Sequence, residues 1–190
     1  MALRVDLGIE IRLSIAHRLR RLFGGYQLAT GTIELPVTYA QQEQGNWCWA
    51  ACCQMLRGLL SKGPLSQCRI ADMRFAGNCC HNGSSAQCNR ATWPHEAYPA
   101  HGIQSKYQDR TLSPVELRAE IDAGRAVQVY YLWNSGVSAH VALVVGYYPG
   151  SEFQVYDSSE TFGPGRRAYD FIVAAYGRGR WRRSYFDIRG

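Results

Sequence analysis

Residues 42–51 read QEQGNWCWAA, and this segment says more about the architecture than any other part of the chain. Asn is a preferred N-cap residue, so Asn46 is expected to start a helix. Good helix formers or apolar residues at helical spacing follow it, namely Ala50, Ala51, Met55, Leu56 and Leu59. Gly63-Pro64 is expected to end the helix. Cys48 is thereby placed in the first helical turn.

A cysteine in the first turn of a helix stands where a thiolate is stabilised by backbone N–H groups and the helix dipole. Trp47 and Trp49 flank Cys48 and can shield it while leaving one approach open. A thiolate attacks carbonyl carbon well, so Cys48 is the expected nucleophile; the simpler alternative is a buried or disulfide-bonded thiol. The dipole contributes only about 1 kcal/mol, so a cationic partner is needed.

The expected partner is His140, which lies within the apolar run 137–147. A polar ring in so apolar a strand needs a partner, because burying it alone costs free energy. Asp157 ends the next expected strand, and two antiparallel strands joined by a short turn can bring the two residues side by side. Asp157 is therefore expected to orient the ring, with Asp170 as the fallback.

Gln42 lies six residues before Cys48. Its side-chain amide can donate a hydrogen bond to an oxyanion, together with the backbone N–H of Cys48. Gln42 is thus the expected oxyanion donor, and Gln44 is a rival for the role.

The rest of the chain contains a further helix and then several strands. Residues 113–116, Ser-Pro-Val-Glu, form a capping box with Pro at the first helical position, and Gly124 is expected to cap the end of that helix. Four strand-like runs follow, at residues 126–132, 138–147, 153–156 and 185–188. Helices followed by an antiparallel sheet define an α+β fold class.

The pattern Gln-x5-Cys-Trp at a helix start, with a later His on one strand and an acid or amide on the next, resembles the papain-like cysteine peptidases. The wording of residues 46–52, NWCWAAC, is most similar to the bacterial avirulence-type group. Residues 67–97 also resemble secreted bacterial relatives of that group, and the whole resemblance covers about residues 35–187.

The resemblance implies a two-lobed fold, with the nucleophile helix in an N-terminal helical lobe and an antiparallel sheet in the C-terminal lobe. The implied roles are nucleophile for Cys48, general base for His140, ring orientation for Asp157 and oxyanion binding for Gln42. Two departures stand out. The Cys-to-His spacing is shorter than in the papain and cathepsin branch, so the specificity pockets of that branch cannot be carried over. The orienting residue is Asp rather than Asn, which favours an imidazolium.

The predicted function is therefore a cysteine endopeptidase that works through a Cys-His-Asp triad and a thioester acyl-enzyme. Two alternatives stay open. The same triad can run deamidation or transpeptidation, which would give product without chain cleavage. The chain can also be a disulfide-rich binding module that kept the fold without the activity.

Seven cysteines all lie between Cys48 and Cys88. The odd number suggests six in up to three disulfides plus one free thiol, which indicates an oxidising compartment. The alternative is that several are small buried hydrophobes. The chain contains no C-x-x-C pair, so we expect neither a zinc site nor another cofactor.

The chain has 190 residues, 46% of them apolar, which excludes a disordered protein. Its formal net charge is +6, yet basic residues cluster beside an aromatic residue only around Trp181, so no nucleic-acid partner is expected. No apolar run is long enough for a transmembrane helix. We expect a monomer that acts on a protein or peptide.

Residues 1–33 are interpreted as an N-terminal extension, and residues 34–190 as the peptidase domain. The extension is rich in Arg and lacks the uninterrupted apolar region of a standard secretory signal. It is expected to be a pro-segment or a non-classical export signal, and the protein is expected to be secreted or exported, as a bacterial effector is.

Overall fold

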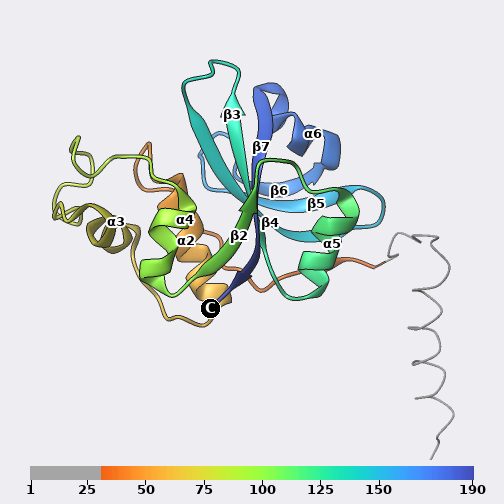
Figure 1. The fold of residues 1–190 in the computed structure, drawn as a ribbon, viewed down its shortest axis with the longest axis horizontal. Helices are drawn as coiled ribbons and strands as arrows, with labels where there is room; N and C mark the ends of the chain where they lie inside the picture. Colours follow the sequence, from red (N-terminus) through yellow and green to blue (C-terminus); the bar gives the residue numbers. More distant parts are fainter. Residues whose placement is uncertain (1–30) are drawn as a thin grey trace, which may run out of the picture.

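The computed structural model describes residues 31–190, so most of the predicted extension 1–33 lies outside the described residues. The first half of the described chain forms a helical lobe (Figure 1). Its elements are α2 (Cys48–Leu59), α3 (Gln67–Phe75), α4 (Pro94–Ala97) and the 3-10 helix η1 (Tyr98–His101).

The start of α2 differs from the prediction by one residue. Trp47 is the N-cap, and its side chain makes no capping hydrogen bond. The expected cap, Asn46, instead donates from its side-chain amide to the carbonyl of Asn89 (2.9 Å) and from its backbone N–H to Asn89 Oδ1 (2.8 Å). Asn46 therefore ties two loops together, and Cys48 is the first residue of α2.

Helix α2 packs against the sheet through small and medium-sized residues. Its buried residues are Trp49, Ala50, Ala51, Cys52, Cys53, Met55 and Leu56. The four consecutive small side chains let the helix approach β4 closely, and the Cys52 thiol lies 3.8 Å from the carbonyl oxygen of Val141 on that strand. Helix α2, which begins with Cys48, thus packs directly on the strand that carries His140.

The second lobe is built on an antiparallel sheet. Its strands are β1 (Ile33–Glu34), β2 (Gln104–Gln108), β3 (Val127–Trp133), β4 (Ala139–Tyr148), β5 (Glu152–Asp157), β6 (Pro164–Ala168) and β7 (Gly179–Arg189). Their order is β2-β7-β3-β4-β5-β6, and β1 pairs with β4. The predicted α+β class, with a helical lobe followed by an antiparallel sheet, is confirmed.

The four predicted strands correspond to β3, β4, β5 and β7, whereas β1, β2 and β6 were not predicted. Strands β2 and β6 lie at the two ends of the strand order and read QSKYQ and PGRRA, without an apolar face that alternation could reveal. Strand β1 pairs with β4 at Gly146, where a Cβ atom would lie 2.6 Å from the carbonyl oxygen of Ile33. Only a glycine permits this approach.

Helix α5 (Pro114–Asp122) has the predicted capping box: Ser113 N–H donates to Glu116 Oε2 (2.8 Å), and Glu116 N–H donates to Ser113 Oγ (3.4 Å). Gly124 follows the helix with φ +74°, as its predicted role at the helix end requires. Helix α6 (Tyr169–Val173) and the 3-10 helix η2 (Ala175–Gly177) lead into β7.

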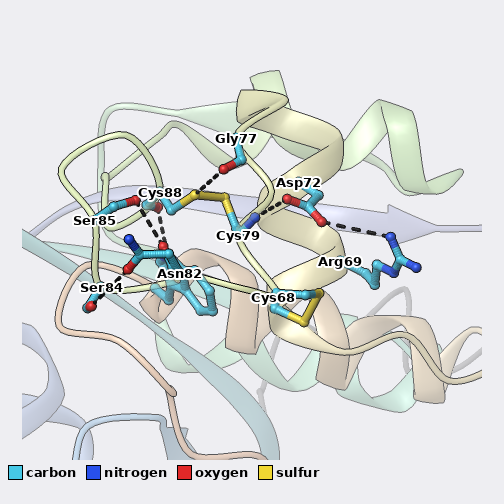
Figure 2. The surroundings of a disulfide bond; sticks show 11 residues. Cys68, Arg69, Asp72, Gly77, Cys79, Asn82, Ser84, Ser85 and Cys88 are labelled. Carbon is cyan, nitrogen blue, oxygen red and sulfur yellow. Dashed lines mark hydrogen bonds and ion pairs between the residues drawn. A yellow bond between two sulfur atoms is a disulfide. The ribbon is translucent and has the colours of Figure 1, made fainter.

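The described residues contain two disulfides rather than three. They join Cys68 to Cys80 and Cys79 to Cys88, and together they cross-link the segment that follows α3 (Figure 2). Cys48, Cys52 and Cys53 are free thiols. The expectation of a single free cysteine was wrong because Cys52 and Cys53 serve as small core residues of α2.

Among residues 31–190, no helix is both long and apolar enough to cross a membrane.

Candidate active site

Cys48 stands at the N-terminal end of α2 with its side chain partly exposed. As the first helical residue, its backbone N–H has no acceptor within the helix. The tryptophans on either side are almost fully buried, and their indole N–H groups donate to the carbonyls of Cys88 (2.8 Å, from Trp47) and Arg90 (3.0 Å, from Trp49). Both rings therefore hold the segment around residues 88–90 against the start of the helix.

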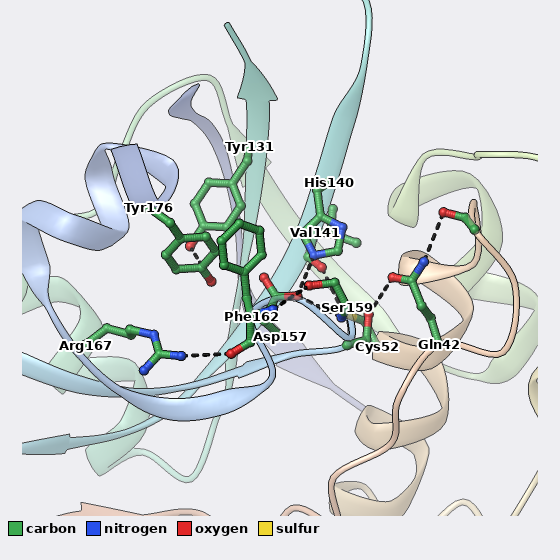
Figure 3. Close-up of polar contacts among 12 residues, drawn as sticks. Gln42, Cys52, Tyr131, His140, Val141, Asp157, Ser159, Phe162, Arg167 and Tyr176 are labelled. Atoms are coloured by element: carbon green, nitrogen blue, oxygen red, sulfur yellow. Dashed lines mark hydrogen bonds and ion pairs between the residues drawn. The ribbon is translucent and has the colours of Figure 1, made fainter. Parts of the chain in front are cut away.

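His140 and Asp157 lie side by side on neighbouring strands (Figure 3). Asp157 pairs with Ala142 in the β4–β5 register, and His140 is two residues from Ala142 on the same face of β4. The ring Nε2 of His140 lies 2.8 Å from Asp157 Oδ1, and both side chains are buried. The other ring nitrogen, Nδ1, does not contact Asp157, and the ring also forms a side-chain hydrogen bond with Cys48.

The surroundings favour a charged His140. Burial alone would lower the pKa of its imidazole, but hydrogen bonds to Asp157 and Cys48, and the charges of both groups, outweigh burial and raise the pKa to about 10. Burial raises the pKa of Asp157, while the hydrogen bond and charge of His140 and a hydrogen bond from Ser159 more than offset this, so the pKa is lowered. Both shifts favour the charged forms, an imidazolium on His140 and a carboxylate on Asp157.

The ring of His140 and the carboxylate of Asp157 are both held from further directions. Trp133 stacks on the imidazole with ring centroids 5.8 Å apart and planes 20° apart. The backbone N–H of Ser159 donates to Asp157 Oδ1 (2.9 Å). The hydroxyl of Tyr176 interacts electrostatically with the same carboxylate. Burial is the largest cause that raises the pKa of Tyr176, and the charge of Asp157 is a further cause.

Gln42 lies in the loop before α2, and this loop is anchored to the sheet lobe. The backbone N–H of Gln42 donates to the carbonyl of Ser158 (2.9 Å), and Ser158 Oγ donates to Gln42 Oε1 (3.2 Å). The amide nitrogen donates to the carbonyls of Gln44 and Gly45 (2.9 Å each). An oxyanion would therefore have to replace one of these two loop carbonyls as the acceptor.

The two fallback residues of the sequence analysis lie elsewhere. The amide nitrogen of Gln44 faces Gly83, where a Cβ atom would be 3.2 Å from it. Asp170 is exposed in the first turn of α6. Gln44 is thus directed toward the disulfide-bonded loop, and Asp157 holds the position beside His140.

Sequence reasoning missed Trp133 and Tyr176. Trp133 ends β3, one residue beyond the predicted strand 126–132, where the pattern indicates only a strand end. Tyr176 follows α6 in η2, a segment whose conformation no pattern predicted, with φ +60° at the tyrosine and positive φ at both neighbours. Within residues 31–190, no three His, Cys, Asp or Glu side chains are placed to hold a metal ion.

The two-lobed fold, with a cysteine at a helix start beside a buried His–Asp pair, defines a papain-like cysteine peptidase. Residues 34–187 match the Peptidase C39 like family, and the chain belongs to this family. No curated protein matches the chain significantly.

The solved structures that the chain is similar to share little sequence with it. The peptidase domain of Streptococcus ComA, a bi-functional ABC transporter involved in a quorum sensing pathway, matches with a TM-score of 0.58 and 10% identity, over 80% of this chain and 98% of that one. A C39-like peptidase from Bacillus anthracis matches with a TM-score of 0.52 and 13% identity, over 82% and 97%. The Pseudomonas avirulence protein AvrPphB is also found, with a TM-score of 0.37 and 10% identity, over 81% and 98%.

Proposed function

We propose that this chain is an endopeptidase that hydrolyses peptide bonds of a protein or peptide substrate, with Cys48, His140 and Asp157 as its triad. The observation that carries the proposal is the buried His140–Asp157 pair (2.8 Å) in contact with a partly exposed thiol at a helix N-terminus. Such a constellation suits acyl transfer, because the imidazolium stabilises the thiolate and then serves as the proton donor.

The thiolate of Cys48 attacks the scissile carbonyl carbon, and the C=O electron pair moves onto oxygen. The oxyanion accepts hydrogen bonds from the Cys48 backbone N–H and from the side-chain amide of Gln42. The amide breaks one of its two hydrogen bonds to loop carbonyls to make this bond. The imidazolium of His140 protonates the leaving amine as the C–N bond breaks, which leaves a thioester. His140 then takes a proton from water, hydroxide attacks the thioester, and the C–S bond breaks to release the acid.

Asp157 keeps the ring of His140 oriented through both steps without itself taking a proton. Its carboxylate holds the proton on Nε2, so that Nδ1 is the nitrogen that gives and accepts protons on the side of Cys48. Trp133 covers the ring and reduces its contact with water.

The test is labelling with an epoxide inhibitor of thiol peptidases, followed by peptide mapping without reduction. We expect one adduct, on Cys48, which His140→Ala abolishes. Cys52 and Cys53 serve as internal controls, because both are free yet buried and should stay unlabelled. A native protein that carries no adduct on Cys48 would contradict the proposal.

The products distinguish hydrolysis from the related acyl transfers. An endopeptidase gives two fragments that together contain one added water, whereas a deamidase leaves the chain whole and converts an amide to an acid. Cys48→Ser and His140→Ala should abolish fragment formation in the same assay.

We also propose that the protein works in an oxidising compartment, as a secreted protein does. The Cys68–Cys80 and Cys79–Cys88 disulfides support this. Non-reducing mass mapping of protein purified from its native source should find both bonds, and four free thiols at these positions would contradict the proposal.

A further inference from the structure

A cavity of about 380 Å³ adjoins the candidate active site. It lies between the end of α3, the segment 90–93 and the strands β3 and β4. Ala139, at its rim, directly precedes His140, and the carbonyl of Arg90 is held by the indole of Trp49, the residue after Cys48. Tyr130, on its wall, interacts electrostatically with the Cys48 thiol. A substrate bound at Cys48 can therefore place a nearby side chain in this cavity.

One of the two arginines that line the cavity is already neutralised. Arg74 forms an ion pair with Glu96, and its Nε donates to Thr92 Oγ1 (2.9 Å), while Thr92 also bonds to Glu96. These three residues form a closed polar group that satisfies its own charges.

Arg90 differs from Arg74, because it forms no ion pair with any of residues 31–190. Its guanidinium carbon lies 4.9 Å from the ring centroid of Phe75, a stacking that restrains the side chain at the cavity. The cavity therefore contains one uncompensated cation, and its remaining walls include the aromatic rings of Trp93 and Tyr130.

We propose that this cavity binds an acidic side chain of the substrate and that Arg90 selects it; this inference rests on the proposed peptidase function. A guanidinium pairs with a carboxylate through two parallel hydrogen bonds, which a neutral amide or a cation cannot reproduce. The aromatic walls accommodate the methylene groups that carry the carboxylate. The fit favours Glu, whose two methylene groups can lie along the rings.

The experiment begins with the wild-type chain and a random peptide library, whose cleavage sites are mapped by mass spectrometry. An acidic residue should be enriched at one position near the cleaved bond. Matched peptides with Glu, Gln, Leu or Lys at that position then give kcat/KM values. We expect Glu to exceed Gln by about 10- to 100-fold, the range of a charge-assisted hydrogen bond.

Two variants of Arg90 and one matched control assign the preference. Arg90→Gln should bring the Glu and Gln peptides to within about threefold of each other, and Arg90→Glu should shift the preference to the Lys peptide. Arg69→Gln removes the same charge from an exposed site on α3 outside the cavity and should leave the preference unchanged. Turnover of the Lys peptide by Arg90→Glu also shows that this variant is folded.

Equal kcat/KM for the Glu and Gln peptides would overturn the inference, and so would a preference for Leu or a Glu preference that Arg90→Glu retains. In each of these cases the wild-type enzyme still cleaves, so the proposed function stands. Absence of cleavage and of epoxide labelling at Cys48 would overturn the proposed function itself.

Discussion

Removing the Cys79–Cys88 disulfide should cost activity before it costs the fold. Four hydrogen bonds join residues 46–49 to residues 88–90, two between Asn46 and Asn89 and one from each flanking indole. These bonds fix the start of α2, and the disulfide fixes Cys88, the first residue of the segment that accepts all four. Without the disulfide, the segment 88–90 should become mobile, and residues 46–49 around Cys48 should lose their fixed position.

The magnitude follows from the length of the loop that the bond closes. A sequence separation of 9 residues corresponds to about 2.6 kcal/mol of chain entropy in the entropic account of disulfides. The open-to-closed ratio of the loop should then rise by about 80-fold when the bond is absent. The four hydrogen bonds, about 1 kcal/mol each, oppose the opening both with and without the disulfide, so they leave this 80-fold change in the ratio unaltered.

The other disulfide provides a matched control. Cys68–Cys80 spans 12 residues and should contribute about 2.8 kcal/mol, nearly the same amount, but neither of its residues takes part in the four bonds to residues 46–49. Each paired Cys→Ser variant should therefore lower Tm by about 5 to 10 °C for a domain of this size. Only Cys79→Ser/Cys88→Ser should lose epoxide labelling of Cys48, by about tenfold or more at 25 °C, a temperature at which circular dichroism still reports a folded chain.

Equal rates of Cys48 labelling in the two double Cys→Ser variants would refute this reasoning. The two disulfides should contribute nearly the same stability, but only Cys79–Cys88 includes a residue that is bonded to residues 46–49. A fall in labelling that tracks the fraction of unfolded protein in both variants would refute it as well. Wild-type protein in strong reductant should behave as Cys79→Ser/Cys88→Ser does, so reductant beyond that needed to keep Cys48 reduced should inhibit.

Three further outcomes are expected. From the pKa of His140, about 10, we expect the basic limb of the wild-type kcat/KM–pH profile near that pH. Asp157→Asn should lower this pKa and move the limb to lower pH, whereas Asp170→Asn should leave it in place. Gln42→Ala should reduce kcat by about 100-fold or more, and Gln44→Ala by much less, in single-turnover assays. The folded-state pKa of His140 lies above its ordinary value of 6.5, so the ring's contribution to stability is full below pH 6.5 and is lost as the pH rises through about 10. Urea titrations across this range should show a fall in the free energy of unfolding that is smaller in His140→Ala.

The sequence predicts those features of the fold and site that periodicity and short-range chemistry encode. The helix after Asn46, the capping box at Ser113 and the strands carrying His140 and Asp157 all follow from local patterns. Adjacency of β4 and β5 follows from the short turn between them, and it places His140 within 2.8 Å of Asp157. These predictions succeed because each depends on residues that are close in the sequence.

The remaining features depend on distant partners. Asn46 reads as a helix cap until Asn89 is known to accept its hydrogen bonds. From the sequence, Trp133 is only the end of a strand, and its stacking on the imidazole of His140 is visible only in the structure. The number of disulfides depends on which cysteines are buried as core residues of α2. The residues next to Cys52 in the sequence do not indicate that it is one of them. Contacts of this kind require the tertiary structure.

The buried His140–Asp157 pair is explained by chemistry better than by stability. Desolvating two charges costs several kcal/mol, and their attraction repays this only when the geometry is good and the remaining polar atoms are satisfied. Asp157 Oδ1 accepts two hydrogen bonds, but Oδ2 is buried without a hydrogen bond of normal geometry to any described residue. An arrangement selected for stability would satisfy both oxygens. In the proposed mechanism, the negative charge of Asp157 keeps the ring of His140 protonated, and the imidazolium then gives its Nδ1 proton to the leaving amine.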